Sequence, residues 1–97
     1  MSDTDTTALK RCCKIVNKYG LHTRSASAIV QLANQFPCEI SLSTDKADSD
    51  ANDMLRLMLL EASKGTEICV SAKGEQADKA VKAMISFIEA GFDELDD

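Results

Sequence analysis

Residues 66–91 read TEICVSAKGEQADKAVKAMISFIEAG and combine a strand signal with the strongest helix signal in the chain. In the first part every second residue is apolar, which is typical of a strand with one buried face: Ile68, Val70 and Ala72. In the second part apolar residues recur at the spacing of a helix with one buried side: Ala77, Ala80, Val81, Met84, Ile85 and Ile88. Gly91 is predicted to end this helix, because glycine tolerates the left-handed conformation common just past a helix.

The residues before this stretch carry further strand and helix signals. Strands are predicted at residues 11–18, 38–43 and 47–51, and helices at residues 24–36 and 54–63. Pro37 disfavours helical geometry in the residue before it and is predicted to end the first helix. Asn52 or Asp53 is predicted to cap the second helix, which Lys64-Gly65 ends.

The predicted order of elements is β-α-β-β-α-β-α. The strands are amphipathic rather than continuously apolar, which favours a sheet with helices on one face and water on the other. We therefore expect an α+β fold, an open-faced β-sandwich.

Composition and charge argue against several classes of protein. The chain of 97 residues has a net charge of −5 and scattered basic residues, which argues against nucleic-acid binding. It has neither an apolar run of membrane-spanning length nor a signal-peptide pattern, so we expect a cytoplasmic protein that does not contact a membrane. Residues 1–9 predict a disordered lead-in to a single domain at residues 10–97. We expect a monomer without metal or cofactor.

The four cysteines, Cys12, Cys13, Cys38 and Cys69, could form disulfides or bind a metal, but their spacing fits neither well. If residues 11–18 form a strand, the adjacent Cys12 and Cys13 point to opposite faces of the sheet. Cysteines of this kind in a cytosolic protein are mostly reduced and pack as small apolar residues. We therefore expect reduced cysteines, and a small thiol or metal protein is an alternative function.

His22, the only histidine, follows a glycine and precedes the first predicted helix in YGLHTRSASAIVQLANQF, residues 19–36. Backbone N–H groups without an intrahelical partner and the positive end of the helix dipole favour an anion at this position. Arg24 can add charge-assisted hydrogen bonds to the same anion. The positive end of the helix also favours a neutral imidazole with a free lone pair.

This pattern has a purely structural interpretation as well, because a histidine before a helix can simply complete a turn. The sequence contains no second histidine, nucleophile-elbow motif or glycine-rich phosphate loop. These absences favour the carrying of a group on one residue over turnover by a catalytic triad.

The sequence resembles the HPr family, the histidine phosphocarriers of the phosphoenolpyruvate-dependent phosphotransferase system, over about residues 11–92. GLHTR at residues 20–24 is similar to the active-site motif of that family, which usually continues with Pro-Ala. LLEASKGTEICVSAKGEQADKAV at residues 59–81 resembles its later segment. The runs LRLMLLEASKG and FIEAGFDE are more similar to the nitrogen-branch members (NPr) than to sugar-branch HPr.

The resemblance implies a four-stranded antiparallel sheet covered on one face by three helices. It also implies a phosphoryl carrier rather than a turnover enzyme, which accepts the group from Enzyme I on Nδ1 of His22 and passes it to an EIIA-type protein. Arg24 would be the phosphate partner, and Thr23 and Ser25 would line the phosphate-binding helix N-terminus. The partner-docking residues implied on the second helix are Met54, Leu55, Leu57 and Met58, and core packing is expected to account for at least half of them.

Two positions depart from the usual pattern of the family. Ser25 replaces the usual proline, and we expect its hydroxyl to supply either an extra phosphate donor or a local helix cap. Asp53 occupies the position of the regulatory serine found in Gram-positive relatives, so phosphorylation by the serine kinase is not expected. A carboxylate there could imitate a modified serine, but a helix-capping role is favoured. The alternative functions are a regulatory adaptor that uses the same surface without obligatory phosphorylation, and a sugar-branch HPr.

Overall fold

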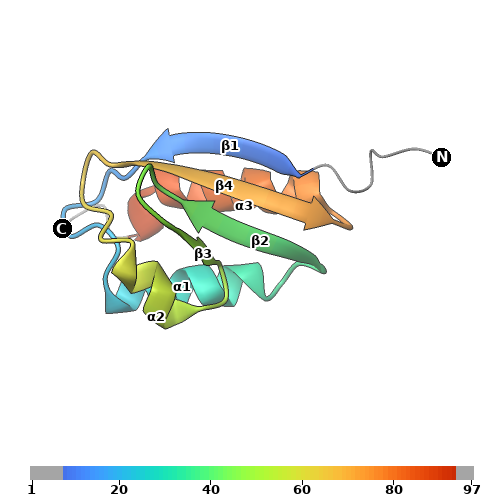
Figure 1. Cartoon of the computed structure of the whole chain (residues 1–97), viewed down its shortest axis with the longest axis horizontal. Coiled ribbons are helices and arrows are strands. Elements are labelled where there is room, and N and C mark those ends of the chain that lie inside the picture. The colour runs from blue at the N-terminus through green and yellow to red at the C-terminus, as the bar shows by residue number, and fades with distance from the viewer. Residues whose placement is uncertain (1–7, 94–97) are drawn as a thin grey trace.

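The computed structural model describes residues 8–93, and its elements follow the predicted order (Figure 1). The strands are β1 (Leu9–Lys14), β2 (Cys38–Ser43), β3 (Asp48–Asp50) and β4 (Glu67–Gly74). The helices are α1 (Thr23–Ala33), α2 (Met54–Leu59) and α3 (Ala77–Glu89), followed by the short 3-10 turn η2 (Gly91–Asp93). Within these residues no helix is long and apolar enough to cross a membrane.

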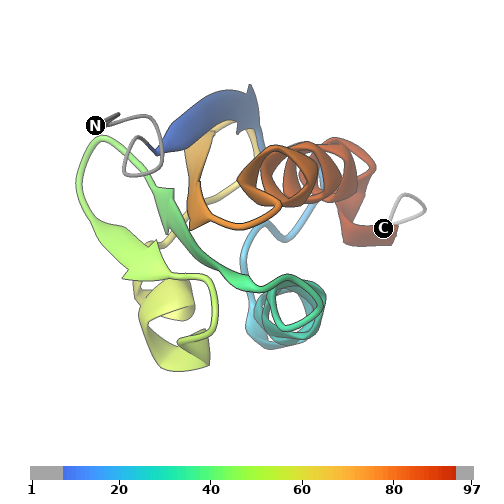
Figure 2. The ribbon, with the colours of Figure 1, turned by 90° about the vertical axis from the view of Figure 1, so that its right-hand side faces the viewer.

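The four strands form one antiparallel sheet in the order β1-β4-β2-β3. The three helices lie on one face of this sheet, and the other face carries no helix of residues 8–93 (Figure 2). This arrangement confirms the predicted open-faced α+β fold. The six apolar residues predicted for one side of α3 are all buried, and they pack against the inward residues of the strands, among them Ile40, Leu42, Ile68 and Val70.

Several boundaries differ from the sequence-based expectation. Strand β1 ends at Lys14 rather than at residue 18, and α1 ends at Ala33, before the predicted end at residue 36. Leu9 already pairs with Ala72, so β1 includes the last residue of the predicted lead-in, whose residues 1–7 lie outside the described part of the chain. Helix α2 ends at Leu59, several residues before the predicted stop at Lys64-Gly65. The left-handed conformation of Glu61, with φ of 54°, ends it, because this conformation turns the chain toward the loop that precedes α1.

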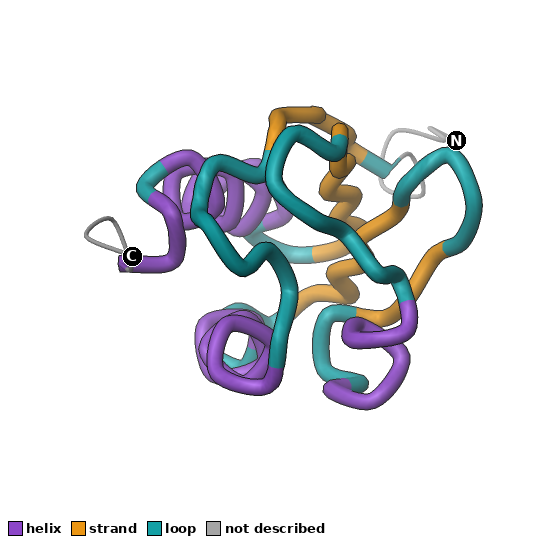
Figure 3. Tube along the Cα trace, turned by 90° about the vertical axis from the view of Figure 1, so that its left-hand side faces the viewer, coloured by secondary structure: helices purple, strands orange, loops and turns teal. Residues whose placement is uncertain are grey.

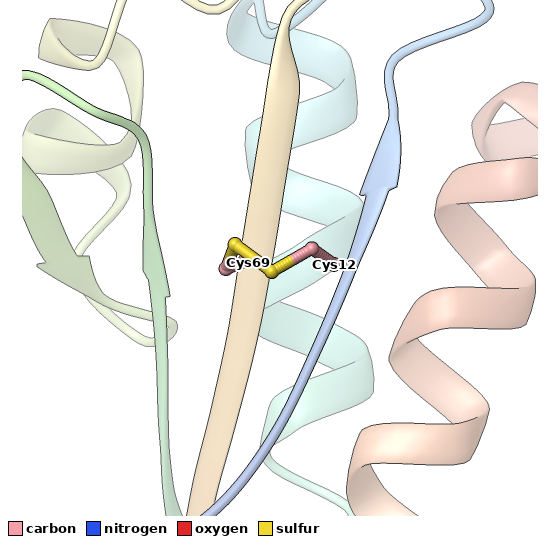
Figure 4. The surroundings of a disulfide bond; sticks show 2 residues. All are labelled: Cys12 and Cys69. Atoms are coloured by element: carbon pink, nitrogen blue, oxygen red, sulfur yellow. A yellow bond between two sulfur atoms is a disulfide. The ribbon is translucent and has the colours of Figure 1, made fainter.

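The expectation of reduced cysteines is wrong for two of the four. Cys12 and Cys69 are register partners on β1 and β4, with Cα atoms 3.9 Å apart, and they form a disulfide on the face of the sheet without helices (Figure 4). Cys13 points to the opposite, buried face, as the strand periodicity predicted. Burial, together with the nearby charge of Glu89, raises the pKa of the Cys13 thiol to about 11. Cys13 and Cys38 are the free cysteines of the described residues, and both pack against the hydrophobic core.

Candidate functional site

The segments before α1 and after α2 lie against each other at one end of the molecule, where the chain is mostly loop (Figure 3). The backbone amide of Leu21 donates a hydrogen bond to the carbonyl of Ala62 (2.9 Å). Farther along, the amide of Ile15 donates to the carbonyl of Thr66 (3.0 Å), and the amide of Gly65 donates to the carbonyl of Ile15 (2.8 Å). These bonds hold the loop that delivers His22 to the start of α1.

Gly20 is the residue that permits this close approach. Its φ is +62°, in the left-handed region, and a side chain there would penetrate the carbonyl oxygen of Ala62 and come within 2.8 Å of the Cα of Ser63. The glycine of the GLHTR motif is therefore required for two reasons. The backbone of Ala62 and Ser63 leaves no room for a side chain, and the turn before His22 needs a left-handed φ.

Replacement of Gly20 by alanine is expected to lower the free energy of unfolding by roughly 2–4 kcal/mol. About 1 kcal/mol of this follows from the left-handed φ, and the rest from moving the loop and losing the Leu21–Ala62 hydrogen bond. Urea unfolding measures the change. Gly65→Ala is the matched control, because Gly65 has φ of +90° with no atom within 4 Å of an added Cβ. Equal losses in the two variants would contradict the close-approach explanation.

His22 is the N-cap of α1, and its imidazole takes part in the cap. Its backbone is extended, and the amide of Arg24 donates a hydrogen bond to Nδ1 over 3.4 Å. The amide of Ser25 also donates to the imidazole as one half of a capping box. A nitrogen that accepts from a backbone N–H must carry a lone pair, so this geometry requires the neutral tautomer with its proton on Nε2.

Ser25 forms the other half of the capping box and is fully buried. Its Oγ accepts a hydrogen bond from the amide of His22 (2.9 Å) and donates to the carbonyl of Gly20 (2.9 Å). Of the two roles expected for this hydroxyl, the structure shows the local cap. These two hydrogen bonds use the proton and a lone pair of the hydroxyl within the loop and hold it away from the solvent-exposed side of the site.

The residues around the imidazole combine positive charge with exposure to solvent. Thr23 and Arg24 are exposed in the first turn of α1, and His22 is half-buried beside them. No acidic residue lies in that first turn. An anion at Nδ1 would meet the N–H groups and positive dipole end of α1 and would lie close in sequence to the guanidinium of Arg24. The arrangement suits a nucleophilic nitrogen that acquires a negatively charged group.

Tyr19 is a neighbour of the site that the sequence alone did not single out. Its ring packs edge-to-face against the imidazole of His22, with centroids 6.1 Å apart and planes at 82°. The ammonium of Lys18 lies 5.3 Å from the centre of the Tyr19 ring. Tyr19 is nevertheless 60% exposed, so its ring borders the site on the protein surface. Its place directly before the Gly-x-His turn is the only sequence signal for this role.

Helix α2 presents apolar side chains near the start of α1, and the hydroxyl of Thr23 lies 4.0 Å from Sδ of Met58. Of the predicted docking residues, Leu55 is 70% exposed, and Met54 and Met58 are half-buried. The prediction for Leu57 is wrong, because its side chain is fully buried in the core. A helix with apolar residues all round does not reveal from its sequence which side faces inward. Leu59, 69% exposed, lies on the outer side instead.

Asp53 is the N-cap of α2, which is the helix-capping role favoured for it from the sequence. Its Oδ1 accepts a hydrogen bond from the amide of Arg56 (3.1 Å), and the guanidinium of Arg56 donates to the carbonyl of Asp48 (3.2 Å). These bonds join the start of α2 to the edge strand β3. The carboxylate of Asp53 therefore has a structural role at the start of α2.

Comparisons with known proteins agree with this site and fold. A family described as "PTS HPr component phosphorylation site" matches residues 9–90. Phosphocarrier protein NPr of Escherichia coli K12 is 36% identical over 87 residues, which cover 89% of this chain and 97% of that protein. Phosphocarrier protein HPr of Pseudomonas aeruginosa is 36% identical over 81 residues, which cover 82% and 90%. The crystal structure of HPr-C-His from Thermoanaerobacter tengcongensis superposes with a TM-score of 0.83 at 34% identity, covering 89% of this chain and 97% of that one. The chain belongs to the HPr family.

Proposed function

We propose that this protein is a histidine phosphocarrier of the phosphotransferase system that takes a phosphoryl group from Enzyme I on Nδ1 of His22. It then passes the group to an EIIA-type protein. The observation that carries the proposal is the hydrogen bond from the Arg24 amide to Nδ1, which places an unprotonated ring nitrogen at the entrance of α1. Membership of the HPr family and the names of the phosphocarrier relatives support the same activity.

The proposed transfer needs only the imidazole lone pair of His22 on this side of the reaction. Nδ1 attacks the phosphorus in line with the phosphorus–nitrogen bond of a phosphohistidine on Enzyme I. The new bond forms to Nδ1 while the electron pair of the breaking bond returns to the histidine of Enzyme I. Transfer to the EIIA-type protein repeats the step with His22 as the leaving group, so the proton on Nε2 stays in place throughout.

The first turn of α1 is proposed to stabilise the phosphoryl group once it is bound. The amides of Arg24 and Ser25 donate to the imidazole in the unmodified protein, and phosphoryl oxygens replace that acceptor after transfer. The guanidinium of Arg24 adds a positive charge, and the exposed Thr23 lies at the same helix entrance. A dianion at the positive end of a helix of 11 residues is favoured by the helix dipole.

Partner docking is proposed to use the exposed apolar side chains around this entrance. Leu55 and Leu59 on α2 and Tyr19 beside His22 are more than half exposed, and Met54 and Met58 are half-buried between the helices. Exposed aromatic and aliphatic anchors near a small polar centre are typical of a protein–protein contact. Enzyme I and the EIIA-type protein would use this surface in turn.

We place the protein in the nitrogen-regulatory branch and in the cytoplasm. The resemblance of residues 55–65 and 87–94 to nitrogen-branch members supports the branch, and so do the NPr names among its relatives. Phosphoenolpyruvate, the phosphoryl source of the system, is a cytoplasmic metabolite. Regulation by a serine kinase at the start of α2 is not expected, because Asp53 lacks a hydroxyl and caps the helix.

The test is incubation of the purified chain with phosphoenolpyruvate, magnesium and Enzyme I from either branch, followed by intact mass measurement. We expect one added phosphate that is labile in acid and stable in base, since a phosphorus–nitrogen bond hydrolyses in acid whereas serine and threonine phosphates survive it. Omission of phosphoenolpyruvate is the control. Faster transfer from the nitrogen-branch Enzyme I supports that branch, and faster transfer from the sugar-branch enzyme contradicts it. Absence of transfer from both enzymes rejects the proposed function.

A further inference from the structure

We infer that Ser25 is a positioning residue that selects the reactive tautomer and orientation of His22, an inference that rests on the proposed function. The buried hydroxyl of Ser25 contacts both the backbone before His22 and the backbone of His22 itself. The side chain of Ser25 does not need to contact the transferred phosphoryl group. Its effect reaches the reaction through the imidazole.

The hydroxyl of Ser25 forms hydrogen bonds with backbone groups of Gly20 and His22. Oγ has one proton, which it directs to the carbonyl of Gly20 at 2.9 Å in preference to the carbonyl of His22 at 3.2 Å. Its lone pair accepts from the amide of His22 at 2.9 Å. Gly20 is the residue in left-handed conformation against Ala62, so the hydroxyl ties the tightest part of the loop to the N-cap.

The second contribution comes from the backbone of Ser25. Its amide donates to the imidazole of His22, next to the amide of Arg24, which donates to Nδ1. Two N–H groups directed at the ring disfavour a proton on Nδ1 and leave that proton on Nε2. The lone pair needed for attack on phosphorus is therefore present before any partner binds.

Proline, which commonly occupies this position in relatives, has neither a hydroxyl nor an amide proton. It can preset φ at the start of the helix but can make neither bond of the capping box. This chain therefore positions its histidine by the hydrogen bonds of Ser25, whereas proline would do so by fixing φ in the first turn of the helix. The two devices predict different responses to substitution.

Three variants separate the contributions. Ser25→Ala keeps the amide and loses the hydroxyl, Ser25→Pro loses both, and Ser27→Ala removes a hydroxyl from a half-buried serine of the same helix as a matched control. The first readout is the fraction of His22 with its proton on Nε2, measured by 15N NMR on the unphosphorylated protein. The second is phosphorylation by Enzyme I, with kcat and KM determined separately.

We expect Ser25→Ala to lower kcat for phosphorylation about tenfold with KM changed less than about twofold, because misplacing a reacting group slows the step without altering docking. The Nε2-protonated fraction should fall in Ser25→Ala and fall at least as far in Ser25→Pro, whereas Ser27→Ala should match the unsubstituted protein in both readouts. Wild-type tautomer fractions and kcat in both Ser25 variants would overturn the inference. If Ser25→Ala does not fold, Ser25→Pro decides, since its ring presets the start of α1.

The two readouts also separate this inference from the proposed function. The tautomer measurement needs no Enzyme I, so it tests the positioning role even if the unsubstituted protein accepts no phosphate. A protein that is phosphorylated normally and shows no response to either Ser25 variant keeps the proposed function and loses the positioning role.

Discussion

Replacement of His22 by asparagine is expected to abolish phosphorylation by Enzyme I, a loss of roughly a thousandfold or more in rate, because no other side chain of the protein offers an imidazole nucleophile. Asparagine is a strong N-cap residue, so its side chain can replace the imidazole as the acceptor for the first turn of α1. The free energy of unfolding should therefore change by less than about 1 kcal/mol. The variant removes the nucleophile and keeps the helix.

Phosphate incorporation is followed by intact mass after incubation with phosphoenolpyruvate, magnesium and Enzyme I. Binding of the unphosphorylated variant to Enzyme I is measured in parallel and should match that of the unsubstituted protein, since the apolar side chains of α2 are unchanged. Stoichiometric phosphorylation of His22→Asn would show that another residue accepts the group.

Reduction of the Cys12–Cys69 disulfide is expected to lower the free energy of unfolding by about 4 kcal/mol. The two cysteines are separated by 57 residues, and a cross-link over that length removes much of the conformational freedom of the unfolded chain. A small domain is stable by only about 5–15 kcal/mol, so this loss is a large part of its total stability. Phosphorylation of His22 should persist, because the disulfide lies on the face of the sheet opposite to the helices.

The measurement is urea unfolding with and without a dithiol reductant. A variant with Cys12→Ser and Cys69→Ser is the control, and its unfolding midpoint should not respond to the reductant. Thiol titration of the denatured protein should find two thiols before reduction and four after it, because the structure leaves Cys13 and Cys38 free. Four thiols in the unreduced protein, or equal stability in both conditions, would contradict the prediction.

The sequence predicted the elements that depend on local periodicity. The apolar spacing in α3 identified every buried position of that helix, and the alternation in CEISLS identified the inward residues Ile40 and Leu42 of β2. The position of His22 at the start of a helix was predicted for the same reason, because the helical spacing of apolar residues in α1 begins just after it in the sequence. Its role as the N-cap follows from that position.

Features that depend on contacts between distant segments could not be predicted in the same way. The pairing of Cys12 with Cys69 follows from the register between β1 and β4, which the spacing of cysteines does not encode. The early end of α2 at Leu59 accompanies the hydrogen bond of Leu21 to Ala62, and the contact of Tyr19 with His22 follows from the shape of the loop between them. The choice between the two roles of Ser25 required the backbone positions of Gly20 and His22.

The disulfide also has a topological consequence for the two helices at the functional site. Residues 12 to 69 form a covalently closed ring that contains both α1 and α2, with α3 outside it. The exposed turn at Asp45 and Lys46 lies between those two helices in the ring. A protease that cuts the chain there separates His22 and Leu55 in sequence, yet leaves both fragments bonded through sulfur. The nicked protein would run as one species on a non-reducing gel and would divide into two only after reduction.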